Sequence, residues 1–237
     1  MNRILCASIM VLSGWSLSCL AEEKDGEGTA KKEKAKEWKE LFDGKSLKDW
    51  EVIDYPGHAE AKVEDGELII EKGVQLSGVR YTGDDFPKID YEIEVVARKI
   101  DGYDFFAGIT FPYKDTHATW VLGGWGGSVV GISSINDEDA YENETMEVRD
   151  FEVDQFYSLR LQVTEKRLIG FIDDDDRVVN VNVEGKRVSM RWGSIEDSVP
   201  LGISTFMVKT GVKSMRIRKL NEEEIATIKK MDDDLPF

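Results

Sequence analysis

The chain has 237 residues and a formal net charge of −16, from 47 acidic and 31 basic side chains. This excess of acid argues against binding to nucleic acid or to an anionic membrane surface, since both need clustered Lys and Arg. A hydrophobic content of 41% with six tryptophans can form the core of one large β-sandwich or of two small domains.

The N-terminal segment has the pattern of a signal peptide. Arg3 provides a basic start, residues 4–20 are largely apolar, and small residues place a cleavage site after Ala21. We therefore expect residues 1–21 to be removed and the mature protein to be secreted or periplasmic, with no membrane span. A retained membrane anchor is the alternative, but the apolar run is marginal in length for a spanning helix.

Both cysteines of the chain, Cys6 and Cys19, lie in this segment. Cleavage after Ala21 would leave a mature chain without a disulfide, a thiolate nucleophile or a zinc–thiolate site. A lipoprotein signal that modifies Cys19 ranks second among the interpretations, because Ser16 stands where such signals carry Leu.

Residues 22–40 are charged and nearly free of large apolar groups, so we expect a linker that does not pack by itself. The decapeptide LFDGKSLKDW follows at 41–50. Its large apolar residues bracket an Asp43-Gly44 turn, in which Gly accepts positive φ and Asp bonds its own backbone. This pattern predicts the first edge of a β-domain.

Residues 41–220 are predicted to form an all-β domain. The segment 91–100 (YEIEVVARKI) alternates apolar and acidic residues, and 157–163 (YSLRLQV) alternates again, as half-buried strands do. Further short strands are expected at 67–71, 105–111, 119–123, 128–132, 168–172, 178–183, 201–206 and 212–218. Many short strands separated by regular turns predict a sandwich or jelly roll.

Residues 221–237 are predicted to contain a short C-terminal helix and an acidic tail. Asn221 is a good N-cap, and Glu224 completes a capping-box pair. Apolar residues recur at three-residue spacing from Ile225 to Met231, so the helix is expected to end near Met231.

The segment 119–135 (TWVLGGWGGSVVGISSI) places Trp120 and Trp125 beside five glycines. Without a strand followed by a helix, these glycines do not predict a phosphate-binding loop. Glycine in a strand marks a bulge or a close approach of ligand or backbone. An exposed Trp beside Gly is also a common way to bind the C–H face of a sugar. Trp120 and Trp125 are therefore candidate substrate platforms, the alternative being that both are core residues.

The loop at 136–150 (NDEDAYENETMEVRD) gathers seven carboxylates in a short span. Such a loop could hold a divalent cation or supply an acid/base pair, with Glu144 as the candidate. Asn143 is a candidate substrate-binding residue in the same loop. EF-hand spacing is absent, the metal stays unspecified, and a simple solvated loop is the alternative.

Histidine is scarce, and His117 directly precedes the Trp120 strand. It is a candidate general base or metal ligand, against the alternative of an ordinary residue at a strand end. Two familiar catalytic patterns are missing from the sequence. There is no G-x-S-x-G nucleophile elbow, and no E-x-D-x-x-E strand of the kind found in laminarinase-like sandwiches.

Four segments carry a resemblance to a known family. They are LFDGKSLKDW, VEDGELII (63–70), the YEIEVVAR strand and the FIDDDDRVV hairpin (171–179). Over about residues 38–220 the chain resembles the 3-keto-disaccharide hydrolase family. The resemblance implies a concanavalin A-like jelly roll of two antiparallel sheets, and activity on oxidised disaccharides or glycosides.

The chemistry that this resemblance implies starts from a 3-keto group, which acidifies the hydrogen at C2 of the sugar. Elimination of the C1 substituent followed by hydration then needs a base near C2 and a group that stabilises the oxyanion. The candidates are His117 or Glu144 as base and Arg149 as oxyanion or hydroxyl donor, with a metal near the ketone left open. The family's catalytic residues do not align onto specific positions of this chain.

The sequence thus leaves three functional hypotheses. The first is a secreted carbohydrate-active enzyme that cleaves 3-keto-glycosides. The second is a non-catalytic glycan-binding module of the same fold. The third is a cell-envelope interaction domain that uses the acidic surface. The first two predict carbohydrate as the partner.

Overall fold

The computed structural model describes residues 37–173 and 176–231. The predicted signal peptide, the linker up to residue 36 and the acidic tail from Asp232 onward lie outside the described residues. Among the helices in the described ranges, none has the length and apolar character needed to cross a membrane.

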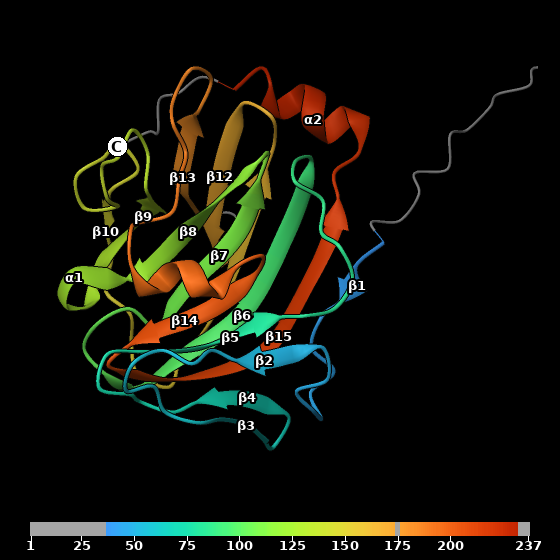
Figure 1. The fold of residues 1–237 in the computed structure, drawn as a ribbon. Coiled ribbons are helices and arrows are strands. Elements are labelled where there is room, and N and C mark those ends of the chain that lie inside the picture. Colours follow the sequence, from blue (N-terminus) through green and yellow to red (C-terminus); the bar gives the residue numbers. More distant parts are fainter. Residues whose placement is uncertain (1–36, 174–175, 232–237) are drawn as a thin grey trace, which may run out of the picture. The chain divides into compact units, whose positions relative to one another are not determined.

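In these two ranges, fifteen strands form two antiparallel sheets (Figure 1). The first sheet has the order β13 (Asp176–Asn182), β12 (Arg167–Ile172), β11 (Phe156–Val163), β6 (Tyr91–Gly102), β15 (Val208–Lys219), β4 (Glu67–Ile70) and β3 (Ala61–Glu64), with β1 (Lys39–Glu40) also pairing to β15. The second has the order β10 (Glu147–Val148), β9 (Val129–Ser133), β8 (Thr116–Gly123), β7 (Ala107–Tyr113), β14 (Gly202–Phe206), β5 (Leu76–Tyr81) and β2 (Trp50–Val52).

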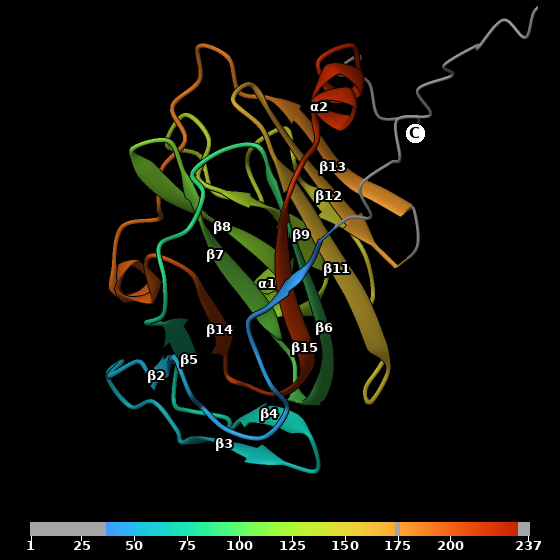
Figure 2. The ribbon, with the colours of Figure 1, turned by 90° about the vertical axis from the view of Figure 1, so that its right-hand side faces the viewer.

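The predicted all-β sandwich is confirmed, and Figure 2 shows the two layers of strands from the side. Strand alternation explains how the layers join. In the first sheet, Ile93 of β6 pairs with Leu161 of β11 and with Ile217 of β15, and all three are buried. Because side chains alternate between faces, a row of this kind presents one continuous apolar surface to the opposite sheet.

The outer face of the first sheet carries charges that pair across the same strands. Glu92, whose side chain is fully buried, forms ion pairs with Arg218 and with Arg160, the latter at 3.0 Å. Arg218 also bonds Glu224 of the C-terminal helix at 2.8 Å. Ion pairs of this kind compensate the cost of burying the charge of Glu92. The pair between Arg218 and Glu224 also links the helix to the sheet.

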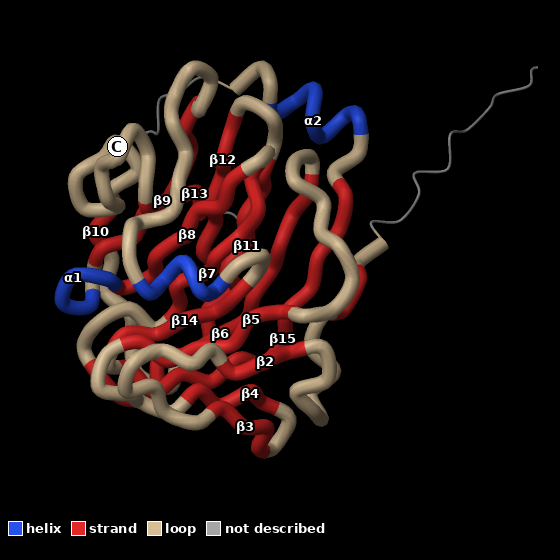
Figure 3. The backbone as a smooth tube through the Cα atoms, in the orientation of Figure 1, coloured by secondary structure: helices blue, strands red, loops and turns tan. Residues whose placement is uncertain are grey.

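The C-terminal helix α2 (Glu222–Ile228) begins with the predicted capping box between Asn221 and Glu224. It ends three residues before the predicted limit at Met231. Figure 3 shows two further helical segments, α1 (Gly124–Gly127) and the 3₁₀ turn η1 (Ser194–Ser198). The sequence did not predict η1, which packs against β5 and β14 of the second sheet.

Candidate functional site

Strand β8 divides its side chains between the core and the outer face of the second sheet. Trp120 is fully buried toward the core. Thr119 and Val121 line a cavity on the opposite face, and His117 lines a second cavity. Because residues two apart on a strand share a face, these three side chains form one row. At about 3.3 Å per residue, His117 lies roughly 7 Å along the strand from Thr119.

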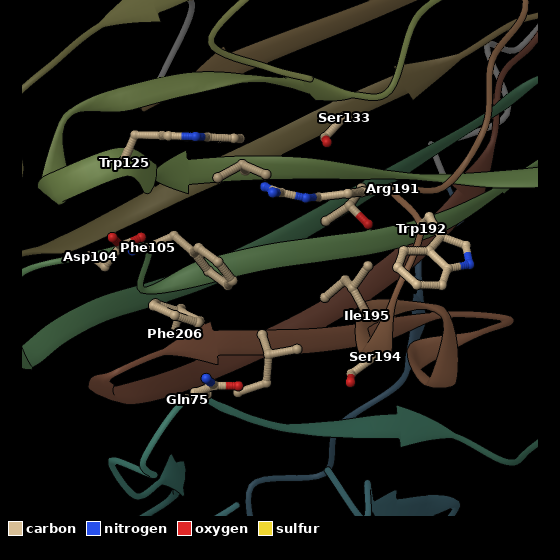
Figure 4. A pocket seen from close by; sticks show the side chains of 13 residues that line it. Gln75, Asp104, Phe105, Trp125, Ser133, Arg191, Trp192, Ser194, Ile195 and Phe206 are labelled. Atoms are coloured by element: carbon tan, nitrogen blue, oxygen red, sulfur yellow. Dashed lines mark hydrogen bonds between the residues drawn. The ribbon is translucent and has the colours of Figure 1, made fainter. Parts of the chain in front are cut away.

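The first cavity, here called the Trp125 cavity, has a volume of about 380 Å³. Figure 4 shows that Trp125 and Trp192 stand at opposite ends of it, with Phe105 and Phe206 along one side. Its polar groups come from Gln75, Asp104, Thr119, Ser133, Arg191 and Ser194. A largely apolar cavity with a few converging polar groups is the usual form of a small-molecule site.

Trp125 is held in an uncommon backbone conformation. It has φ 47° and ψ 51°, in the left-handed region that bulky residues seldom adopt. Asp104 supports this turn by accepting a bond from the Gly126 backbone N–H at 3.1 Å. The indole packs on Tyr141, with ring centroids 4.9 Å apart, and remains 36% exposed. Strained residues of this kind gather at ligand sites, because the surrounding structure must hold them there.

Arg191 extends along the cavity toward Trp125, as Figure 4 shows. Its guanidinium carbon lies 5.8 Å from the centroid of the indole ring, and Nη1 lies 3.3 Å from Asp139 Oδ2. Asp139 Oδ1 accepts bonds from the hydroxyl groups of Ser133 and Ser134, at 2.9 and 3.2 Å. Asp139 therefore positions one cation and one hydroxyl group of the Trp125 cavity.

The second cavity, here called the His117 cavity, adjoins the first, because Arg191 and Trp192 line both. It has a volume of about 790 Å³ and a mostly polar and charged lining. Partial burial lowers the pKa of His117, and the charge of Lys88 lowers it further. The imidazole is therefore neutral at pH 7 and able to accept a proton.

The structure corrects the prediction for Trp120. Its indole packs between the sheets, where a Cβ on Gly170 would meet its ring at 2.8 Å. A fully buried ring cannot serve as a sugar platform. Trp125, by contrast, lines a cavity on the surface.

Asn143 is also corrected, because it holds the acidic loop together. It is buried and donates from Nδ2 to the carbonyl groups of Ile132 and Glu138, at 2.8 and 2.9 Å. Its Oδ1 accepts from the backbone and hydroxyl groups of Thr145. With these bonds made, the amide has no exposed edge to offer a substrate.

Glu144 and Arg149 lie outside the two cavities described. Glu144 pairs with Lys186 at 2.6 Å, and Arg149 pairs with Asp176 at 2.5 Å. Their predicted roles as base and oxyanion donor do not fit these positions, because each charge is already engaged elsewhere on the surface.

Sequence reasoning missed Arg191 and Trp192, which lie in the irregular segment before η1. The signal was present as MRWG at 190–193, a tryptophan next to a glycine in a stretch without strand alternation. In 37–173 and 176–231, no group of three or more His, Cys, Asp or Glu side chains gathers as a metal site.

A family model described as the 3-keto-alpha-glucoside-1,2-lyase-like domain matches residues 37–218. The chain belongs to this family. The match confirms the resemblance seen in the sequence, and it covers the whole sandwich. As its name states, the 3-keto-alpha-glucoside-1,2-lyase-like family is one of carbohydrate-active domains. No curated protein sequence matches the chain.

The chain is also similar in fold to solved structures of other proteins. A Crh5 transglycosylase in complex with NAG is 14% identical, with a TM-score of 0.53 over 78% of this chain and 84% of that one. The Emp46p carbohydrate recognition domain, solved as a point mutant, is 14% identical, with a TM-score of 0.50 over 74% and 90%. At this identity the likeness shows a shared jelly-roll fold.

Proposed function

We propose that the protein cleaves 3-keto-glycosides, with the oxidised sugar ring bound in the Trp125 cavity. The observation that carries the proposal is the shared wall of the two cavities. Trp125, an exposed ring held at the mouth, and His117, a neutral base, lie on either side of Arg191. Membership of the 3-keto-alpha-glucoside-1,2-lyase-like family supports the substrate class.

The lining of the Trp125 cavity suits a sugar ring. A pyranose has flat C–H faces and a rim of hydroxyl groups. Trp125, Phe105 and Phe206 offer apolar surface to the faces. Thr119 and Ser133 offer hydroxyl groups to the rim, and Arg191 offers a cation. A ketone on the ring adds an acceptor that the guanidinium can bond.

The proposed reaction begins with proton transfer from C2 of the sugar to the neutral imidazole of His117. The electron pair of the C–H bond forms an enolate with the 3-keto group, and Arg191 stabilises the negative charge on its oxygen. The bond between C1 and the leaving oxygen then breaks as the enolate collapses to an enone. His117 returns the proton to the leaving oxygen, and addition of one water across the C1–C2 double bond gives the free 3-keto sugar.

The test follows turnover of a chromogenic 3-keto-glucoside in D₂O. Elimination followed by hydration predicts that the product carries one deuterium at C2. The control is the amount of deuterium that the product takes up when it is incubated in D₂O without protein. His117→Asn should lower turnover by about 100-fold or more, the scale of general-base catalysis. Glu144→Gln is the matched control on a carboxylate outside the cavities and should leave turnover unchanged. Absence of turnover, or undiminished turnover in His117→Asn, contradicts the proposal.

A non-catalytic glycan-binding module is the second candidate. It is favoured by the hydrogen bonds of Asp104, a carboxylate that lines the Trp125 cavity. Both its oxygens accept backbone N–H bonds, from Phe105 at 2.8 Å and from Gly126 at 3.1 Å, so it serves the turn around Trp125. Calorimetry with oligosaccharides separates the two functions. Binding without turnover, lost in Trp125→Ala, supports the module.

A further inference from the structure

Trp192 stands out among the large apolar side chains of the described residues. Its indole is 91% exposed, far more than that of Trp125. Single exposed apolar residues are ordinary on protein surfaces. Trp192 differs in its position, because it lines both the Trp125 cavity and the His117 cavity and so marks the boundary between them. Figure 4 places it at the end of the first cavity opposite to Trp125.

The backbone on both sides of Trp192 is fixed. Arg191 is tied to Asp139, as described above. Gly193 has φ 126° and ψ −162°, a conformation open essentially to glycine, and its N–H donates to Glu196 Oε2 at 3.2 Å. The hydroxyl of Ser198 then bonds that of Thr110 on the sheet at 2.6 Å. The exposed indole is therefore carried by an anchored segment.

The lining of the His117 cavity indicates which kind of ligand would contact the indole of Trp192 there. Arg187 donates to Asp137 at 2.8 Å, and Asp139, Ser134 and Ser189 line the same cavity. Donors and acceptors thus lie close together around a space of about 790 Å³. Hydroxyl groups both donate and accept, so a hydroxylated ring fits this lining better than an apolar one does.

We propose that Trp192 is a second sugar platform, which stacks on the ring of the leaving group and selects substrates in which that group is itself a sugar. This inference rests on the proposed function and deepens it. Trp125 binds the oxidised ring, His117 lies near the bond to be broken, and Trp192 binds the next ring. The His117 cavity then receives the hydroxyl groups of the leaving sugar.

The experiment compares 3-keto-glucosides that differ only in the leaving group, methyl or glucosyl. Trp192→Ala should raise KM for the glucosyl substrate by about tenfold, the scale of one aromatic stacking contact, and leave kcat and the methyl substrate within about twofold. Trp192→Phe should restore most of the loss. An equal effect on both substrates, or no effect on either, overturns the inference. Because the side chain is exposed, the variants should keep the wild-type melting temperature.

A third substrate separates a sugar from any flat ring. A 3-keto-glucoside with a nitrophenyl leaving group also stacks on an indole but lacks hydroxyl groups. Arg187→Ala should raise KM for the glucosyl substrate and leave the nitrophenyl substrate unchanged. If Arg187→Ala affects neither, the assignment of the second ring to a sugar is overturned.

The two proposals fail in different ways. If the wild-type protein turns over the methyl substrate and Trp192→Ala leaves the preference for glucosyl unaltered, the reaction stands and the role of Trp192 fails. If the wild type turns over none of the substrates, the reaction fails. Calorimetry with unoxidised glucose disaccharides and methyl glucoside then tests Trp192 alone. A loss in Trp192→Ala confined to the disaccharides supports its role, and equal binding overturns it.

Discussion

The guanidinium of Arg191 lies over the indole of Trp125, with its carbon 5.8 Å from the ring centroid. The same guanidinium pairs with Asp139, whose Oδ2 lies 3.3 Å from Nη1. A cation fixed at the face of an aromatic platform places positive charge where a bound ring would present its oxygen atoms. Arg191 lines both cavities, and its contact with Trp125 is the centre of the proposed site.

Removing the cation should weaken ligand binding more than it weakens the fold. Arg191→Ala deletes a charged donor whose side chain is about half exposed. We expect a loss of saccharide affinity of about ten- to 100-fold, the scale of a hydrogen bond to a charged group. The melting temperature should stay near that of the wild type. Affinity within twofold of the wild type, measured by calorimetry, would show that Arg191 does not contact the ligand.

Trp125→Gly separates the indole from the backbone strain that it bears. Glycine adopts φ 47° without cost, whereas a left-handed residue with a side chain costs about 1–2 kcal/mol. The free energy of unfolding of the variant, measured in urea, should therefore lie within about 1 kcal/mol of the wild-type value, because relief of strain offsets the lost contact with Tyr141. Saccharide affinity should fall about tenfold or more. An unchanged affinity would remove Trp125 from the site.

The pH dependence of turnover should report the state of His117. Burial, and then the charge of Lys88, lower the pKa of its imidazole. A base must be deprotonated, so kcat/KM should rise with pH and level off, with a midpoint below the ordinary histidine value of about 6.5. Lys88→Ala removes one lowering influence and should move the midpoint upward. A profile with its midpoint above 6.5, or one that Lys88→Ala moves downward, would contradict this role.

Gly170 is expected to be essential to the packing of Trp120 between the sheets. A Cβ at this position would lie 2.8 Å from Cζ2 of the indole and 3.2 Å from Cβ of Val179. Gly170→Ala should lower the free energy of unfolding by about 1–3 kcal/mol, as overpacked cores do. Measured in urea, the double variant with Trp120→Phe should lose less than the sum of the single changes. A Gly170→Ala protein as stable as the wild type would contradict this packing.

Replacing Glu92 should also lower the free energy of unfolding, because its carboxylate holds charges together on the outer face of the first sheet. Its buried carboxylate pairs with Arg160 and Arg218. Glu92→Gln removes the buried negative charge that these two arginines share, at a cost of about 3–5 kcal/mol. Glu51→Gln, on an exposed pair with Arg80, is the matched control and should cost less than about 1 kcal/mol. Equal effects of the two changes on urea unfolding would show that burial does not matter here.

Much of the fold could be predicted because alternation is a strong signal where one face of a strand is buried. The predicted strand at 91–100 became β6, which runs from Tyr91 to Gly102, and 157–163 became most of β11. β5 (Leu76–Tyr81) gave no clear signal, because Ser77 and Gly78 interrupt its apolar residues. A small residue is needed there, since a Cβ on Gly78 would meet the Ile203 carbonyl oxygen at 2.6 Å.

The candidate site was harder to predict, and one part of it was within reach. His117 and Trp120 are three apart on one strand, so period-two alternation already places them on opposite faces. The sequence could thus have separated the base from the buried tryptophan. Arg191 and Trp192 gave only the weak local signal of a tryptophan next to a glycine, because their place at the cavities depends on how η1 packs on β5 and β14 of the second sheet.

The most direct measurement is a crystal structure of the His117→Asn protein with a 3-keto disaccharide. The account predicts the oxidised ring on Trp125, its ketone oxygen within bonding distance of Arg191, and C2 facing position 117. The second ring should lie against Trp192. A disaccharide bound on another face of the sandwich, or one whose oxidised ring lies away from both Trp125 and Arg191, would contradict the central claim.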